Sequence, residues 1–175
     1  AVAIDSLYHG DHPTFRGGSV YASAIDLLGV DTMELTVNGK ALRDNFRQST
    51  YDRLQLAELL AQHPDLDGDG AADVDATRML LGGVSLGGIM GPEHMALSDR
   101  IGGGILLTGG ARLASVLTDG TYVDVLLGFL KDLAGTEGGM WRMFMALQTT
   151  IEPGDGVNYA PHVLADRITA GPPQD

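Results

Sequence analysis

The sequence predicts an α/β fold in which a parallel sheet is covered by helices. Two short apolar runs, residues 78–84 and 101–108, have the length and composition of strands, and the first reads as a strand buried on both faces. A helix-like stretch separates the two runs, and apolar residues also recur at helical spacing between residues 38 and 63. Strands that alternate with helices along a chain are typical of parallel sheets with helical cover.

The N-terminal part of the chain has a weaker pattern. Residues 1–5 predict a brief apolar strand that runs into a turn at residues 8–13. A loop that contains glycine and serine is expected at residues 17–23. Residues 26–38 carry no pattern that assigns them to a helix or a strand.

Short apolar helices are expected from about Ala111 onward. Apolar residues cluster at 113–117, 123–133 and 140–147, and glycine-containing breaks separate the clusters. Three helices inserted after a sheet strand are typical of a cap over an active site. Their methionines would suit a flexible acyl chain, because thioether side chains adapt their shape to a ligand. The alternative interpretation is that they are ordinary core or covering helices.

Composition and charge narrow the class of protein. The chain has 175 residues, 44% of them hydrophobic, and no apolar run near eighteen residues, which indicates one domain or part of one without a transmembrane helix. Its net charge of −12, with eleven scattered basic residues, argues against nucleic acid as a partner. Acidic surfaces are common in exported bacterial proteins, so we expect a secreted or cell-envelope location. The absence of cysteine excludes disulfides and thiolate metal sites.

The most informative motif is Gly83-Val84-Ser85-Leu86-Gly87, at the junction of a strand-like run and a helix-like run. On a sharp turn between a strand and a helix, a serine hydroxyl is exposed and ready to act as a nucleophile. We expect Gly83 and Gly87 to remove side chains that would collide across the turn. The Leu86 N–H, at the start of the helix, is expected to face a tetrahedral oxyanion. The alternative is a glycine-rich turn with an incidental serine, such as a nucleotide-binding loop, but no G-x-G-x-x-G or Walker lysine accompanies it and no organic cofactor is expected.

A second motif, at residues 65–73, favours a structural calcium ion. Carboxylates stand at loop positions 1, 3, 5 and 9, a glycine at position 6 allows the sharp turn, and a backbone carbonyl is expected to ligate from position 7. Ala76 stands where a bidentate glutamate is usual, so the affinity is expected to be modest unless Asp75 substitutes. The alternative is a solvated acidic turn. The expected ligands are Asp65, Asp67, Asp69, Ala71 and Asp73.

Five segments together carry a resemblance to a known family. They are Asp5-Ser6-Leu7-Tyr8-His9-Gly10, Arg43-Asp44-Asn45-Phe46-Arg47-Gln48, Asp67-Gly68-Asp69-Gly70, Gly83-Val84-Ser85-Leu86-Gly87-Gly88 and Asn158-Tyr159-Ala160-Pro161-His162. The chain resembles, over nearly its whole length, the bacterial virulence-factor-type lipase group of the α/β-hydrolase fold. The resemblance implies a partial hydrolase core at residues 1–110, a helical cap at 111–150 after the sixth strand, and a return segment at 151–175 toward the C-terminal core.

The same resemblance implies a serine carboxylic-ester hydrolase, a lipase or esterase that forms an acyl-enzyme on Ser85 and acts on a small-molecule or lipid ester. It also implies a central piece of such an enzyme, because the family order is nucleophile, acid, histidine, and no acid loop with a terminal histidine follows Ser85. His162 has the best place in sequence order for the base, although its surroundings match a segment before the acid. Another chain or fragment is then expected to complete the sheet.

Two other classes of function remain open from the sequence. A degenerate or truncated hydrolase-like domain would be a non-catalytic binding or structural module. A peptidase or an acyltransferase would use the same serine turn for a different acyl transfer. An aspartate and a histidine further along the full reading frame would favour the enzyme.

Overall fold

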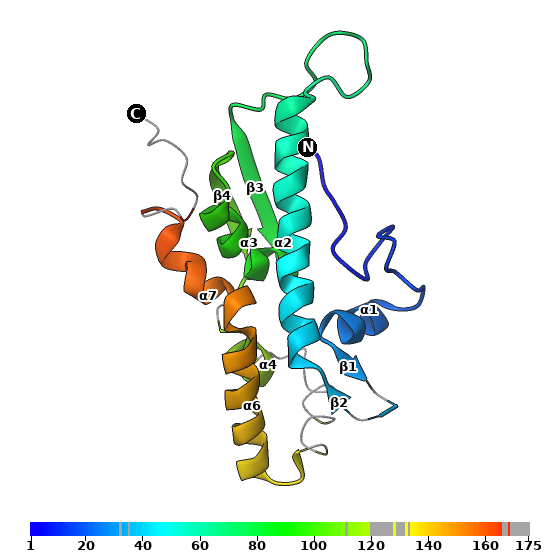
Figure 1. Ribbon diagram of the computed structural model, residues 1–175, viewed down its shortest axis with the longest axis vertical. Helices are drawn as coiled ribbons and strands as arrows, with labels where there is room; N and C mark the ends of the chain where they lie inside the picture. Colours follow the sequence, from blue (N-terminus) through cyan, green and yellow to red (C-terminus); the bar gives the residue numbers. More distant parts are fainter. Residues whose placement is uncertain are drawn as a thin grey trace. The chain divides into compact units, whose positions relative to one another are not determined.

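Two compact units make up the chain in the computed structural model (Figure 1). The structure describes residues 1–31, 33–34, 36–110, 112–119, 128, 132, 134–165 and 168. The first unit comprises Ala1–Ile4, Ser49–Gly109 and Gly156–Asp175, and the second comprises Asp5–Gln48 and Gly110–Asp155. The fold class is mixed α/β with two small sheets, one of them parallel, as the alternation of elements in the sequence predicted.

The parallel sheet of the first unit joins two predicted strands. β3 (Met79–Val84) and β4 (Ile101–Leu107) pair in parallel, with Gly83 opposite Leu106. α3 (Leu86–Leu97) connects the strands and packs against both. This order follows from geometry, because two parallel neighbours need a crossover between them. The two strands and the helix between them are confirmed.

α3 lies close to one face of this sheet because glycines line the contact. A Cβ at Gly91 would collide with the side chain of Leu106, and a Cβ at Gly104 would lie 2.8 Å from the Met95 sulfur. Met90 and Met95 of the helix are buried. The core of the first unit therefore includes the layer between α3 and this face of the sheet.

The opposite face of the sheet is exposed, which corrects the prediction of a strand buried on both faces. Leu80 and Val84 of β3 are 77% and 64% exposed, and Ile105 and Leu107 of β4 are 69% and 54% exposed. Paired residues of parallel strands point to the same side, so these four side chains share one face. The physical reason is that α3 covers one face of the two strands, while the described residues leave the other face open.

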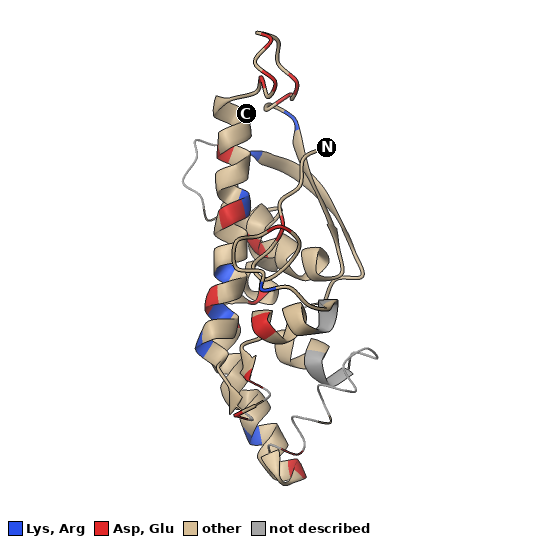
Figure 2. Ribbon diagram, turned by 90° about the vertical axis from the view of Figure 1, so that its right-hand side faces the viewer, with Lys and Arg blue, Asp and Glu red and all other residues tan. Residues whose placement is uncertain are grey.

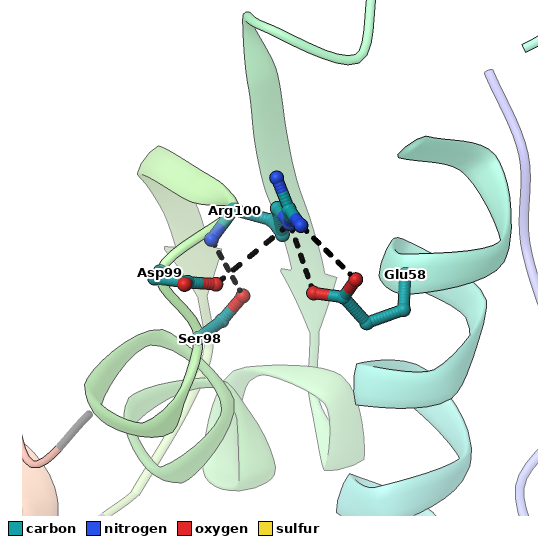
Figure 3. Close-up of polar contacts among 4 residues, drawn as sticks. All are labelled: Glu58, Ser98, Asp99 and Arg100. Atoms are coloured by element: carbon teal, nitrogen blue, oxygen red, sulfur yellow. Dashed lines mark hydrogen bonds and ion pairs between the residues drawn. The ribbon is translucent and has the colours of Figure 1, made fainter. Parts of the chain in front are cut away.

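α2 (Gly39–Gln62) confirms the predicted long helix, and its second half belongs to the first unit. Basic and acidic residues are spread along its length (Figure 2). Thr50 Oγ1 donates a hydrogen bond of 2.8 Å to the buried Glu93 carboxylate of α3. Arg100, before β4, donates two hydrogen bonds to the Glu58 carboxylate, at 2.8 and 3.1 Å (Figure 3). These contacts join α2 to the helix and the sheet of the first unit.

The second unit begins with elements that the sequence left unassigned. α1 (Val20–Leu27) is followed by the antiparallel pair β1 (Val30–Asp31) and β2 (Thr36–Val37). The loop predicted at residues 17–23 is therefore wrong in its second half, where the chain is already helical. Ser19 explains the start of this helix, because its side chain accepts a backbone N–H of the first turn.

Two further helices, α4 (Leu113–Asp119) and α6 (Glu137–Ile151), belong to the second unit together with the 3-10 turn η1 (Glu152–Gly154). They confirm the first and third of the predicted apolar helices. The middle cluster, residues 123–133, lies outside the described residues apart from 128 and 132. The buried apolar residues of this unit include Leu27, Leu42, Phe46, Leu113, Phe144, Leu147 and Ile151.

The strand predicted at residues 1–5 is absent. These residues are exposed and pair with no described strand, so the prediction is wrong. Apolar composition alone does not make a strand, because the backbone groups of a strand must find a neighbour. The turn after it is confirmed: Asp5 Oδ2 accepts the Asp11 N–H at 2.9 Å, and Gly10 has a φ of 53° and no room for a Cβ beside the Asp5 carboxylate.

The first unit also contains α7 (Gly156–Tyr159) and the 3-10 turn η2 (Ala160–His162), both of which pack against α3. A Cβ at Gly156 would lie 2.6 Å from the Ile89 carbonyl, so glycine permits the close approach of α7. Among the described residues, no helix has the length and apolar character needed to cross a membrane.

Candidate functional site

Ser85 lies between β3 and α3 in a backbone conformation that few residues other than glycine adopt. Its φ and ψ are 52° and −113°, a combination that costs a residue with a side chain roughly 1–3 kcal/mol. Its N–H donates to the Leu107 carbonyl at 3.0 Å and to Thr108 Oγ1 at 3.2 Å, and its carbonyl accepts the Ile89 N–H at 3.0 Å. These bonds hold the sharp turn that the sequence predicted.

Of the two glycines expected to prevent a collision at the Ser85 turn, one does so and the other does not. A Cβ at Gly83 would collide with the Gly87 carbonyl, so this glycine is required as predicted. A Cβ at Gly87 would have no atom within 4 Å, which corrects the prediction that this glycine relieves a collision. Gly88 is the second required glycine, because its Cβ would lie 2.7 Å from the Leu107 carbonyl and 2.9 Å from Gly109 Cα.

The arrangement around Ser85 provides a nucleophile position and one hydrogen-bond donor. Ser85 is exposed, and its hydroxyl makes no hydrogen bond to another residue of the described chain. The Leu86 N–H begins α3, where the helix dipole is positive, and no described residue accepts it. An exposed hydroxyl beside an available N–H at a helix start offers a nucleophile position and one donor to an oxyanion, and acyl transfer to serine requires a base in addition.

His94 lies on the helix that follows Ser85 and is buried. Both ring nitrogens lack a hydrogen-bond partner in the described structure. Burial, and then the nearby positive charge of Arg53, lower the His94 pKa from 6.5 to about 4. The ring is therefore neutral at physiological pH, and it forms no hydrogen bond with Ser85.

His162, the histidine that the sequence placed best as a base, ends η2 in the first unit. Both η2 and Ser85 adjoin α3, but no hydrogen bond joins His162 to Ser85. Within the described ranges, the structure brings Ser85 and Leu86 together and provides no base hydrogen-bonded to the serine.

The acidic loop follows α2 in the first unit and is built around the Asp65 carboxylate. Asp65 Oδ1 accepts the Gly68 N–H at 2.7 Å and Oδ2 accepts the Gly70 N–H at 2.9 Å. These two bonds, that from Gly70 first, lower the pKa of the Asp65 carboxyl. Gly68 and Gly70 have φ values of 81° and 90°, so the predicted sharp turn at Gly70 is confirmed.

Three of the predicted calcium ligands lie near one another in this loop. Carboxylate oxygens of Asp65, Asp67 and Asp73 lie within 4.8 Å of one another, a spacing that suits a metal ion. Asp69 is outside this group, and its carboxylate accepts the Ala71 N–H at 2.8 Å. The oxygen-only donor set fits a hard cation such as calcium.

Two buried carboxylates were not singled out from the sequence. Asp155 is fully buried and accepts hydrogen bonds from the N–H groups of Arg112 and Leu113 at the start of α4 and from the Gln148 side chain. In the first unit, the Glu93 carboxylate accepts a hydrogen bond from the Thr50 hydroxyl. In both cases a partner lies 43 residues away, so local spacing gives no sign of the bond.

Comparison of the chain with family models, with curated proteins and with solved structures gave no match.

Proposed function

We propose that this chain carries the nucleophile of a serine carboxylic-ester hydrolase of the α/β-hydrolase fold. Ser85 is the attacking residue, and the Leu86 N–H is one donor of the oxyanion hole. The observation that carries the proposal is the positive φ of an exposed serine between a parallel strand and a helix. A backbone conformation of this kind destabilises the folded state by about 1–3 kcal/mol, and such conformations cluster at functional sites.

In the proposed reaction, Ser85 Oγ attacks the carbonyl carbon of an ester while a base takes the hydroxyl proton. The carbonyl oxygen becomes an oxyanion that accepts the Leu86 N–H, the alcohol leaves with a proton from the base, and an acyl-enzyme remains. Water then attacks the acyl carbon, which releases the carboxylic acid and regenerates the serine hydroxyl. The base and its orienting carboxylate are proposed to come from other segments of a longer protein that contains this chain.

A fluorophosphonate probe tests the assignment of the nucleophile. The longer protein should be labelled at Ser85 alone, and Ser85→Ala should keep its melting temperature while hydrolysis of short p-nitrophenyl esters falls by about four to six orders of magnitude. The 175 residues alone should show little or no turnover, because an unassisted hydroxyl stays protonated at neutral pH. Mass spectrometry of the labelled peptide identifies the modified residue.

Ser6→Ala is the matched control, because it removes a hydroxyl from the turn of the second unit and should change neither labelling nor hydrolysis. Labelling of a different serine in the longer protein, or full activity of Ser85→Ala, would show that Ser85 is not the nucleophile.

A non-catalytic binding or structural module is the second candidate. The exposed face of β3 and β4 favours it, because monomeric proteins rarely leave four large aliphatic side chains together in water. In this case the longer protein would fold and bind its partner, and Ser85→Ala would change neither its folding nor its binding.

A further inference from the structure

The second unit contains a groove of about 520 Å³ that the proposed ester chemistry does not use. β2, the first turn of α2 and one face of α6 line it. The lining residues of α6 recur at helical spacing from Met143 to Thr150, so they form a single stripe. The volume falls within the range of roughly 300–1,000 Å³ that is typical of small-molecule sites.

The walls of the groove are mainly apolar. Thr150 adds to this character, because its hydroxyl donates to the Ala146 carbonyl at 2.8 Å and is engaged with its own helix. A Cβ at Gly39 would lie 3.2 Å from Leu147 Cδ1 and 3.3 Å from the Thr150 methyl carbon, so glycine lets α2 approach α6 closely. The apolar lining residues are Val37, Met143, Ala146 and Leu147.

Lys40 is the one charged side chain among the described residues that line the groove. It is exposed and forms no ion pair with another described residue. Asp44, one turn further along α2, is paired with Arg43 at 2.7 Å. A single positive charge beside an apolar groove complements a ligand with one negative charge and an aliphatic chain.

We infer that this groove binds a free straight-chain carboxylate, with the chain along the stripe of α6 and the carboxylate at the Lys40 ammonium. The inference does not rest on Ser85, which belongs to the other unit. Apolar contact supplies most of the affinity, and the lysine selects the sign of the charge.

Calorimetric titration of the full chain tests this inference, with dodecanoate below its micelle concentration as the ligand. Binding should be one to one, and affinity should fall by about two- to fourfold for each methylene removed in decanoate and octanoate. Dodecyltrimethylammonium should bind several-fold more weakly than dodecanoate, because its positive charge lies beside the positive charge of Lys40. Vesicles that carry anionic lipid headgroups should not displace dodecanoate.

Two variants, each with a matched control, test whether the ligand binds in this groove. Lys40→Ala should weaken dodecanoate binding by about two- to fivefold, the range expected of an exposed ion pair, and Arg78→Ala, which removes an exposed cation from the first unit, should not. Ala146→Phe should abolish binding, because Ala146 is exposed and the ring would fill the groove, whereas Met145→Phe on a neighbouring face of α6 should leave it intact.

Ser85→Ala should bind dodecanoate as the unchanged chain does, so a failed nucleophile assignment leaves this test unaffected. Equal affinity for the anionic and cationic amphiphiles, or unchanged affinity in Ala146→Phe, would overturn the inference. So would a change of oligomeric state in Ala146→Phe without any dodecanoate binding by the parent, which would make the groove a contact between copies of the chain.

Discussion

Gly87 and Gly88 are neighbours at the start of α3 with different packing around them. A side chain at Gly88 would meet the backbone of Leu107 and Gly109, whereas a side chain at Gly87 would meet nothing. We predict that Gly88→Ala lowers the free energy of unfolding by about 1–3 kcal/mol, because the strand and the helix must separate. Urea unfolding followed by circular dichroism measures this change.

Gly87→Ala is the matched control, one position away in the same helix. It should leave the free energy of unfolding unchanged or raise it by up to about 1 kcal/mol, because alanine loses less backbone entropy in a helix than glycine does. Equal destabilisation by both variants would show that the turn itself, and not the contact with the strand, excludes a side chain.

His94 makes stability depend on pH through its lowered pKa. The folded-state pKa is about 4 and the ordinary value is 6.5, so the unfolded chain binds the proton more readily. The contribution of the neutral ring to the free energy of unfolding is fully present above pH 6.5. As the pH falls toward 4, up to about 3 kcal/mol of this contribution is lost. We predict that His94→Leu flattens the curve of unfolding free energy against pH within this window.

His63→Leu is the control for this titration, because His63 is exposed at the end of α2. Its pH curve should follow that of the unchanged protein. A parallel loss of stability in His94→Leu between pH 6.5 and 4 would assign the dependence to carboxylates instead.

At the scale of elements, local patterns predicted the segments whose contacts are local. The run of residues 78–107 gives β3, α3 and β4 because each strand neighbours the helix that follows or precedes it. The strand expected at residues 1–5 failed, because pairing depends on a distant neighbour that composition does not reveal. α1 was missed because its start is signalled by a single capping serine within a stretch that contains glycine.

The same contrast applies within the candidate site. The pentapeptide around Ser85 predicted the sharp turn, since a strand, a serine and a helix follow one another in sequence. The need for Gly88 was missed, because the atoms that exclude a side chain there belong to the backbone at the end of β4 and just after it. The buried environment of His94 was also beyond the sequence, since Arg53 lies on another helix.

The acidic loop after α2 is an element whose proposed ion can be tested directly. Three carboxylates within one short loop repel one another, and a bound cation would remove that repulsion. We predict that a few millimolar calcium stabilises the fold by about 1 kcal/mol, which corresponds to a rise in melting temperature of about 2–4 °C. Asp67→Ala combined with Asp73→Ala should abolish the rise.

Asp11→Ala removes an exposed carboxylate outside the loop and should keep the response to calcium. Differential scanning calorimetry with and without calcium measures both variants against the parent chain. An unchanged melting temperature of the parent in calcium, with no heat of binding, would identify the loop as a plain acidic turn.

At the scale of the whole molecule, the β3–β4 sheet has the composition of an interior sheet. Neither strand contains a charged residue or a proline, the devices by which proteins protect an exposed strand edge. Each strand pairs on one side only with another strand of the described chain. Parallel sheets are ordinarily covered on both faces, so this sheet is suited to receive further strands and cover from a partner.

We therefore predict that the 175-residue chain associates with itself or with a fragment that supplies strands. Size-exclusion chromatography should give early or broad peaks, and the amides of residues 79–84 should exchange rapidly with solvent, because weakly supported strands open locally. Leu80→Lys combined with Ile105→Lys should sharpen the monomer peak, since charges on the open face oppose stacking. Leu59→Lys, at an exposed leucine of α2, is the control and should leave the association unchanged. A sharp monomer with strongly protected amides at residues 79–84 would show that the sheet is already covered, and a partner for it would then be unnecessary.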